Sequence, residues 1–362
     1  MMKISLTPSF FGETEKVLFE HGKMSLSLFR YSTGICGMTL KNARGYMTVL
    51  PFKGFQVWRA GFDGHELVMK TLFDEPTEST EYCKTYGAFL IHCGLTAIGN
   101  PDVGAGDTHP LHAELPNIGY DKAWAVCGED EKGKYVELCG SCRYVFGFET
   151  GYEFRPTYRL YENATTFTVH NEIENLRGCR QEYSYMCHMN FRPVDGSRLV
   201  YSAKTENIYV HELVPDTLTK DEQQKLKDYF GILKKDIHAH DLIGGEGQFY
   251  QPEVVFTVKY ETDEEGRGHC MQVFPDGYAG YVSHHPAQLP FGIRWISRFP
   301  NEDAVGMLLP ATGEHNGHAD CVKKGYIRYM EADETVSIDF ETGLLTPDEV
   351  TAMKEKIARM TV

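Results

Sequence analysis

The fold class is decided by one stretch of the sequence, KYVELCGSCRYVFGFETGYEFRPTYRLY, residues 134–161. It is rich in Tyr, Val, Phe and Thr, which favour β-strands over helices. Similar segments lie on both sides of it, among them KMSLSLFRYS, TTFTVHNEIEN and EVVFTVKYE. Turn segments such as GEDEKGK and PVDGS separate the strands about every eight to twelve positions. This spacing predicts an all-β sandwich of antiparallel strands rather than alternating strands and helices.

Two segments depart from this pattern and predict helices. Residues 219–237 begin with a threonine cap and an acidic first turn, which predicts a helical insertion between strands. Residues 346–360 begin with a threonine followed by proline, a favoured helix start, which predicts a C-terminal helix. No repeat, low-complexity tract or Gly/Ser linker divides the sequence, so we expect one domain over residues 1–362.

The composition is typical of a globular protein, with 42% hydrophobic and 24% charged residues. The formal net charge is −15, and no local cluster of Lys and Arg offsets it. This charge disfavours nucleic acid and anionic lipid as partners, and favours a neutral or cationic small molecule. The first residues lack a long apolar core and no apolar run is long enough to span a bilayer, so we expect a cytoplasmic protein with no membrane partner.

One loop concentrates titratable side chains, GDTHPLHAELPN at residues 106–117. His109 and His112 lie three residues apart, and Glu114 follows them. Two histidines alone are a weak signal for a metal site. The loop therefore has three interpretations: an acid/base site for a sugar, a metal site, or a polar loop without a ligand.

A second candidate is the segment EYSYMCHMNFRP, residues 182–193. If it is a strand, one face carries Glu182, Ser184, Met186, His188 and Asn190 because side chains alternate. Such a polar row suits the lining of a polar cavity. A strand that faces solvent is the alternative.

Further polar candidates occur in four segments, the first of which is residues 281–299. The tandem His284 and His285 point to opposite faces of a strand, so at most one of them enters a given site. The same segment has Arg294 beside Trp295, which could stack on a sugar face or equally belong to the core. The other three segments are each by themselves more typical of a surface than of a site, and they hold Arg59 beside Trp58, Glu253, and Glu314 in a polar loop with His315, His318 and Asp320 over residues 308–321.

Four blocks of the sequence resemble the galactose-mutarotase-like superfamily, and within it a branch of aldose 1-epimerase-like proteins once classified as a domain of unknown function. The blocks are LPFKGFQVWRAGFDG, GAFLIHCGLTAIGNPDVGAGDTHPLHAELPN, CHMNF and GMLLPATGEHNGH. The resemblance implies a galactose-mutarotase-like β-supersandwich whose concave face holds a monosaccharide or the end of an oligosaccharide.

The resemblance also implies a reaction. In members that mutarotate, a glutamate removes the proton from O1 of the sugar and a histidine protonates the ring oxygen, so the ring opens and recloses on the other face. Position by position, His188 matches the strand histidine that is the usual acid, and His112 matches the histidine of the family's Leu-His-Gly motif. Histidine titrates near neutrality and suits this role.

Two family positions are changed in this chain. The catalytic glutamate before proline in the family's Gly-Leu-Glu-Pro motif is Leu309 here, and the expected Leu-His-Gly-Arg ends in Ala113 and Glu114. Leucine cannot accept a proton. Either another carboxylate replaces the base, or the reaction has changed, or the protein binds sugars without converting them. The candidate replacements are Glu114, Glu182, Glu253 and Glu314.

Three hypotheses follow. The first is an aldose 1-epimerase-like isomerase without a cofactor, with His188 as acid, His112 as a ligand of the sugar, and Glu253 or Glu314 as base. Its expected substrate-binding residues are Arg59, Glu114, Glu182, Asn190, Arg294 and Trp295.

The second hypothesis is a sugar isomerase or epimerase that acts at carbon with the help of a divalent metal. Its ligands would be His112, His188 and His284 or His285, with Glu114 or Glu182. The third is a carbohydrate-binding protein without catalysis. The sequence leaves open which sugar is bound and whether the chains form a homo-oligomer.

Overall fold

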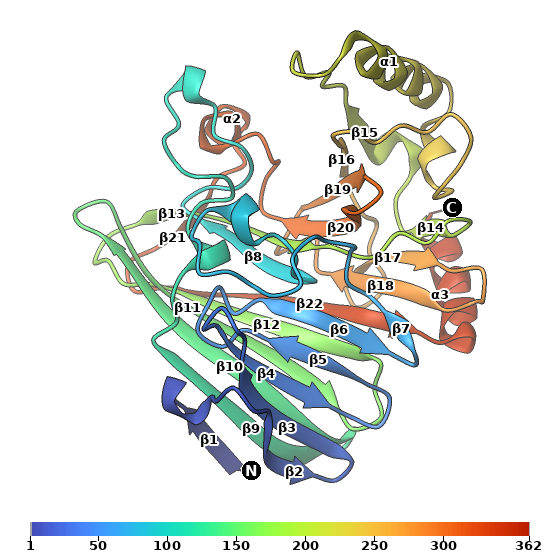
Figure 1. Ribbon diagram of the computed structural model, residues 1–362. Coiled ribbons are helices and arrows are strands. Elements are labelled where there is room, and N and C mark those ends of the chain that lie inside the picture. Colours follow the sequence, from blue (N-terminus) through green and yellow to red (C-terminus); the bar gives the residue numbers. More distant parts are fainter. Residues whose placement is uncertain (1, 362) are drawn as a thin grey trace.

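Two antiparallel β-sheets pack against each other and form the body of the molecule (Figure 1). The computed structural model describes residues 2–361. Residues 134–161 form the long hairpin of β10 and β11, in which Tyr135 pairs with Tyr161 and Phe146 with Thr150. The predicted all-β class of antiparallel strands is confirmed.

One sheet has nine strands. In spatial order they are β1 (Met2–Leu6), β9 (Lys122–Asp130), β10 (Gly133–Phe146), β11 (Thr150–Tyr161), β12 (Thr166–Asn175), β22 (Thr335–Leu345), β18 (Ala279–His284), β17 (Gly268–Val273) and β14 (Arg198–Tyr201).

The other sheet has thirteen strands. Its main path is β15 (Ile208–His211), β16 (Val254–Val258), β19 (Phe291–Arg298), β20 (Asp303–Ala311), β13 (Gln181–Met189), β8 (Leu90–Leu95), β6 (Val57–Phe62), β5 (Gly45–Val49), β4 (Cys36–Lys41), β3 (Met24–Arg30) and β2 (Lys16–His21). Off this path, β21 (Arg328–Met330) pairs with β13 and β7 (His65–Glu66) pairs with β6.

Both predicted helices are present. They are α1 (Lys220–Lys235) and α3 (Pro347–Met360), and the side chains of Thr219 and Thr346 cap them in complete capping boxes. The helix predicted over residues 219–237 ends at Lys235, because Asp236 adopts an extended backbone.

The polar loop predicted over residues 308–321 is in part regular structure. Strand β20 continues to Ala311, and the short helix α2 (His318–Lys324) begins inside the segment. The backbone N–H of Ala319 donates to the carboxylate of Asp107 (3.0 Å), so a distant loop stabilises the first turn of α2. Six short 3₁₀ turns complete the structure: η1 (Pro8–Phe10), η2 (Tyr82–Thr85), η3 (Val103–Ala105), η4 (Leu115–Asn117), η5 (Thr205–Asn207) and η6 (Ile237–His240).

A hydrogen-bonded network joins the two sheets through the apolar core. His92 on β8 contacts the hydroxyls of Tyr185 on β13 (2.7 Å) and Tyr158 on β11 (2.8 Å). The Tyr158 hydroxyl donates to the carbonyl of Phe55, and Asn171 on β12 donates to the Tyr185 hydroxyl. Both ring nitrogens of His92 and both tyrosine hydroxyls therefore have partners in the core, whereas Oδ1 of Asn171 is buried without one.

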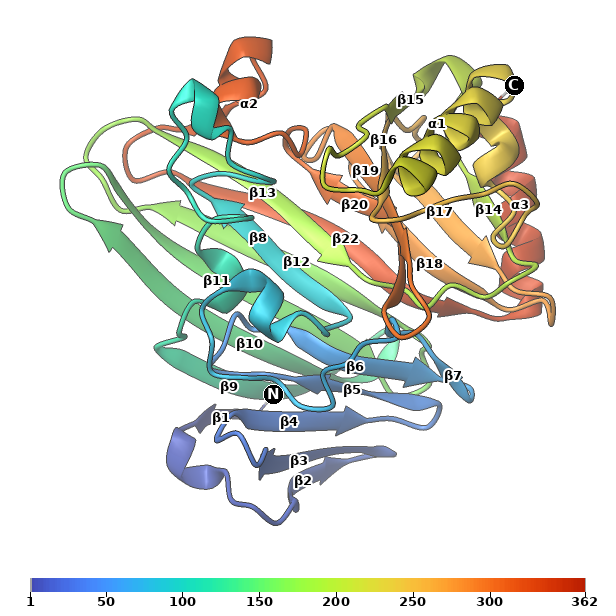
Figure 2. The same cartoon turned by 45° about the horizontal axis from the view of Figure 1, so that its top comes forward.

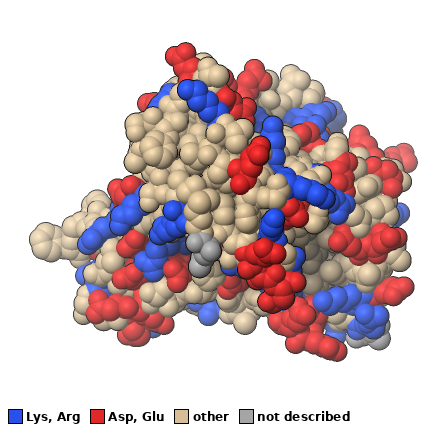
Figure 3. All heavy atoms as spheres, turned by 90° about the horizontal axis from the view of Figure 1, so that it is seen from below, with Lys and Arg blue, Asp and Glu red and all other residues tan. Residues whose placement is uncertain are grey.

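The outer face of the thirteen-stranded sheet carries two raised groups of loops and helices (Figures 1 and 2). One contains η3 and α2, and the other contains β15 and α1. On the face shown in Figure 3, acidic and basic side chains are interspersed. None of the helices between residues 2 and 361 combines the length and the apolarity needed to cross a lipid bilayer.

Two loops cross closely at Gly99 and fix the first of these raised groups. The N–H of Asn100 donates to the carbonyl of His315 (3.2 Å), and Gly99 forms a bridge with Asn316. Gly99 has φ +80°, and a Cβ at this position would collide with the carbonyl oxygen of His315. A residue without a side chain is therefore required at the crossing.

We expect Gly99→Ala to destabilise the fold more than the matched change Gly106→Ala. Gly106 also has a positive φ, +97°, but a Cβ there would meet nothing within 4 Å. Its replacement should cost only the left-handed backbone strain, about 1–2 kcal/mol, and Gly99→Ala should add about 1–3 kcal/mol for the collision. Urea unfolding of both variants measures the difference; equal losses would show that the crossing does not constrain the chain.

Candidate active site

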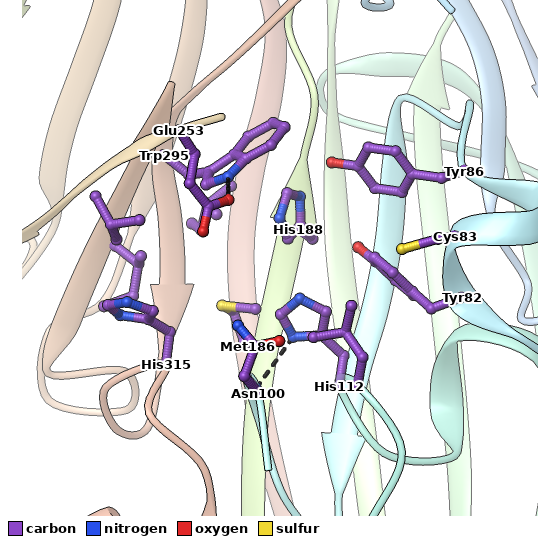
Figure 4. Close-up of a pocket in the computed structure, with 15 residues that line it drawn as sticks. Tyr82, Cys83, Tyr86, Asn100, His112, Met186, His188, Glu253, Trp295 and His315 are labelled. Atoms are coloured by element: carbon purple, nitrogen blue, oxygen red, sulfur yellow. Dashed lines mark hydrogen bonds between the residues drawn. The ribbon is translucent and has the colours of Figure 1, made fainter. Parts of the chain in front are cut away.

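A cavity of about 210 Å³ lies above β13, β19 and β20, where the crossing loops approach the sheet (Figure 4). A single water needs only roughly 10–15 Å³ on this measure, so the cavity suits a small organic ligand. Its floor comes from strands, with Met186 and His188 on β13 and Leu309 on β20. Its walls come from η2 and from the loops at residues 99–112 and 312–317.

His188 lies at the centre of this cavity. Its ring lines the cavity, and its Nδ1 is buried without a hydrogen-bond partner. The rings of Trp295, His112 and Tyr86 surround it with centroids at 5.2, 5.5 and 5.8 Å. Burial lowers the pKa of His188 to about 4, because an apolar setting disfavours the imidazolium. His188 is therefore neutral at pH 7.

The backbone fixes His112 in orientation and tautomer. Its N–H donates to the carbonyl of Gly99 (3.0 Å), and the N–H of Gly99 donates to Nδ1 of His112 (3.1 Å). Because Nδ1 accepts, the proton of the neutral ring is on Nε2, which can donate to a ligand. Burial, together with the neighbouring His188, lowers the pKa of His112 well below its usual value.

The segment that carries His112 has an unusual backbone. His112 and Ala113 both have left-handed φ angles, +59° and +60°. Such a conformation costs a residue with a side chain about 1–2 kcal/mol. Ala113 occupies the position where the family's motif has glycine. The strain persists because the hydrogen bonds of His112 overdetermine its position, as is common at functional sites.

An aromatic wall stands opposite the sheet. The ring of Tyr82 lies 4.8 Å from that of His112, and the ring of Tyr86 lies edge-on to that of Trp295 at 6.1 Å. Asn190 supports this wall from behind, because its Oδ1 accepts from the Tyr86 hydroxyl (2.7 Å). Burial raises the pKa of both tyrosines well above the usual value, so both keep their hydroxyl protons.

Glu253 is the one Asp or Glu among the described residues that line the cavity. It directly precedes β16, and its Oε2 accepts a hydrogen bond from Nε1 of Trp295 (2.5 Å). Figure 4 shows Glu253 and Trp295 on one side of His188, with Tyr82 and Tyr86 on the other. The cavity therefore presents a carboxylate and a neutral imidazole on neighbouring parts of its surface.

Leu309 also faces the cavity, so the position of the family's base is apolar in this chain. It pairs with Ile293 across β19 and β20, and the register of these strands shifts between Ile293 and Trp295. A bulge of this kind bends a strand and redirects its side chains. Ile293 and Trp295 both line the cavity, on either side of the bulge.

Four of the sequence-predicted site residues meet in this cavity: His112, His188, Glu253 and Trp295. Glu314 lies outside it. The carboxylate of Glu314 accepts from Nζ of Lys324 (2.6 Å) and from the Thr257 hydroxyl (3.1 Å), and the next residue, His315, lines the cavity in its place.

Glu114 is buried behind the cavity rather than in it. It accepts from the N–H groups of Leu95 (2.9 Å) and Thr96 (3.2 Å), and from the hydroxyls of Thr96 (2.5 Å) and Tyr152 (2.6 Å). Three of these donors meet Oε1 and the Thr96 hydroxyl meets Oε2, so the carboxylate is held by groups of the protein itself. Burial nevertheless raises the pKa of Glu114 above its usual value.

Arg59 and Arg294 also lie outside the cavity. Arg59 donates to the carbonyls of Gly87 (2.8 Å) and Phe73 (3.0 Å) and thereby secures the segment that carries η2. Arg294 alternates with its cavity-lining neighbours and points between the sheets. There it donates to the carbonyl of Met307 (3.0 Å) and to Nε2 of His240 (2.5 Å).

The remaining predicted residues do not line the cavity either. Glu182 is exposed and pairs with His318 (2.8 Å). His284 is buried in β18 against Tyr260, with ring centroids 5.2 Å apart, and His285 contacts the carbonyl of Gly266. His284 thus does not meet His112 and His188. Across residues 2–361, no three His, Cys, Asp or Glu side chains are grouped so that they could hold a metal ion.

Three residues that line the cavity were not predicted as site residues from the sequence: Tyr82, Tyr86 and His315. Tyr82 and Tyr86 lie in a short 3₁₀ turn and at its end, and this segment has no periodic apolar pattern that would place it over the sheet. Their spacing of four in EYCKTYGAF was the available signal. His315 was noted only as one member of a polar loop.

A family described as a domain of unknown function (DUF4432) matches residues 32–344. The chain belongs to this family. No curated protein matches this family member in sequence.

Solved structures share its fold. A putative aldose 1-epimerase from Klebsiella pneumoniae has a TM-score of 0.82 at 14% identity, over 100% of this chain and 96% of that one. A galactose mutarotase-like protein from Clostridium acetobutylicum has a TM-score of 0.62 at 12% identity, over 90% and 100%. A galactose 1-epimerase from Lactobacillus acidophilus has a TM-score of 0.53 at 12% identity, over 92% and 98%. The galactose-mutarotase-like fold that the sequence predicts is thereby confirmed, and identities this low support the fold alone.

The burial of His188 gives a direct spectroscopic expectation. In an NMR titration its ring signals should shift with a pKa of about 4. His170 is a matched internal control, because its hydrogen bond to Asp339 raises its pKa above the usual value. His188→Gln assigns the signal by its disappearance. A measured pKa of His188 near the unperturbed value, about 6.5, would contradict its burial in an apolar environment.

Proposed function

We propose that the protein is an aldose 1-epimerase-like sugar mutarotase in which Glu253 provides the base that Leu309 cannot. The observation that carries this proposal is the placement of one carboxylate, Glu253, in the same small cavity as His188. Mutarotation requires a general base and a general acid at the same bound sugar, and a glutamate and a histidine can fill these two roles. The shared fold with proteins named aldose 1-epimerases supports it.

In this proposal the reaction is a proton exchange without a cofactor. Glu253 removes the proton from O1 of the bound sugar while protonated His188 gives its proton to the ring oxygen. The bond between C1 and the ring oxygen breaks, and C1 and O1 become a carbonyl group. After rotation about the C1–C2 bond, the ring oxygen attacks the other face of C1. His188 then takes its proton back and Glu253 returns the other to O1.

The remaining groups would bind and orient the sugar. Nε2–H of His112 is a donor of fixed position for a hydroxyl group, and Asn100 offers both donors and acceptors at the rim. The faces of Tyr82, Tyr86 and Trp295 give the apolar surface on which the CH groups of a sugar ring pack. A hydrogen bond from Trp295 holds the carboxylate of Glu253 in place.

A carbohydrate-binding protein without catalysis is the second candidate, and one observation favours it. Leu309 puts an apolar side chain into the cavity at the family's base position. In this case sugars would bind to the same residues, but their anomers would not exchange faster than in buffer.

Glu253→Gln separates the two candidates. It keeps the size of the side chain and removes its basicity, so we expect the rate of anomer exchange in NMR to fall by roughly 10²–10⁴-fold while the sugar still binds. Glu182→Gln is the matched control, because Glu182 is exposed and does not line the cavity. It should leave the rate unchanged. Equal rates for Glu253→Gln and the wild type would exclude Glu253 as the base.

The pH dependence tests the role of His188. Burial lowers its pKa to about 4, so the protonated fraction in the free protein grows as the pH falls. If His188 donates the proton to the ring oxygen, kcat/KM should rise from about pH 8 to about pH 5, after subtraction of the buffer reaction. If neutral His188 is instead the base, kcat/KM should stay nearly constant over this range, because a group with a pKa of about 4 remains neutral down to about pH 5.

A further inference from the structure

A second cavity of about 490 Å³ opens directly beside the first. The two share Asn100, Glu253, Val255 and His315 in their linings. They are therefore parts of one continuous cleft, and we name the second cavity the outer groove. Glu253 and His315 lie at the junction of its two parts.

The outer groove has an apolar wall and a polar rim. Leu213 and Pro215, from the segment between β15 and α1, give the wall, and the side chain of Leu213 is 69% exposed. Asp102 and Asn316 provide polar groups on the loops opposite. An apolar surface for a ring face with polar groups for hydroxyls is the arrangement that a second sugar unit requires.

The charge of the cleft excludes an anionic occupant. Among the described residues that line the cavity and the outer groove, none is Lys or Arg, whereas Asp102 and Glu253 are acidic. Lys324, at the end of α2, lines neither part of the cleft, and its Nζ is already paired with Glu314 (2.6 Å) and Asp320 (2.8 Å). A phosphate or carboxylate group in the outer groove would meet like charge and no Lys or Arg, and burial lowers the pKa of the lining His211, which disfavours its cationic form.

We propose that the cleft has two subsites and that its ligand is an uncharged disaccharide rather than a single sugar. The reducing unit occupies the cavity over His188, and the second unit lies in the outer groove against Leu213. The linkage between the two units passes Glu253 and His315. This inference rests on the proposed function, since it extends the same site.

The test compares neutral disaccharides with their own monosaccharides. Calorimetry gives the Kd of maltose, cellobiose and lactose against glucose and galactose, for the wild type and for Leu213→Asp. Leu72→Asp is the matched control, because Leu72 is 66% exposed and lines neither part of the cleft. Glucose 6-phosphate and glucuronate test the exclusion of anions.

We expect at least one disaccharide to bind on the order of tenfold more tightly than its reducing unit. Leu213→Asp should remove this advantage and leave the affinity for the monosaccharide unchanged, and Leu72→Asp should change neither. The inference is overturned if no disaccharide has an advantage, if Leu213→Asp does not reduce it, or if the anionic sugars bind best. The proposed function fails separately, when the wild type does not accelerate anomer exchange of any bound sugar.

Discussion

The crossing of two loops at Gly99 determines the geometry of the site. The backbone of Gly99 holds His112 from both sides, through its carbonyl and its N–H, while the next residue binds the carbonyl of His315. One short stretch of backbone thus fixes the ring of His112 and the main chain at His315. His188 belongs to β13 in the interior of the sheet. The left-handed backbone at His112 is the local cost of this arrangement.

Burial then sets the charges of the site. It lowers the pKa values of His112, His188 and His315, so their rings are neutral at pH 7 and can both donate and accept hydrogen bonds. Glu253 is the acidic side chain among the described lining residues. A neutral, aromatic cavity with one carboxylate suits an uncharged ligand with many hydroxyl groups, which agrees with the strongly acidic net charge of the chain.

The features that depend on residues close together in the sequence could be predicted from it. The strand-rich pattern gave the fold class, and the threonine caps located both long helices. Alternation on β13 correctly placed Met186 and His188 on one face. In contrast, the use of Glu114 and Arg294 depends on partners far away in the chain, such as Tyr152 and His240, which no local pattern reveals. The tyrosines of η2 were missed for the same reason, since a loop carries no periodicity that indicates where it folds.

Exchange NMR of the wild type in deuterated buffer, with a panel of neutral aldoses and ketoses, is the most direct test of sugar mutarotation without the family's glutamate. The account predicts faster exchange between anomers of at least one sugar, with no deuterium at any carbon, because only protons on oxygen move. Deuterium at C2 or a neighbouring carbon would contradict it and would indicate an isomerase that acts at carbon. Binding of sugars without faster exchange would contradict it as well, and would leave a carbohydrate-binding protein.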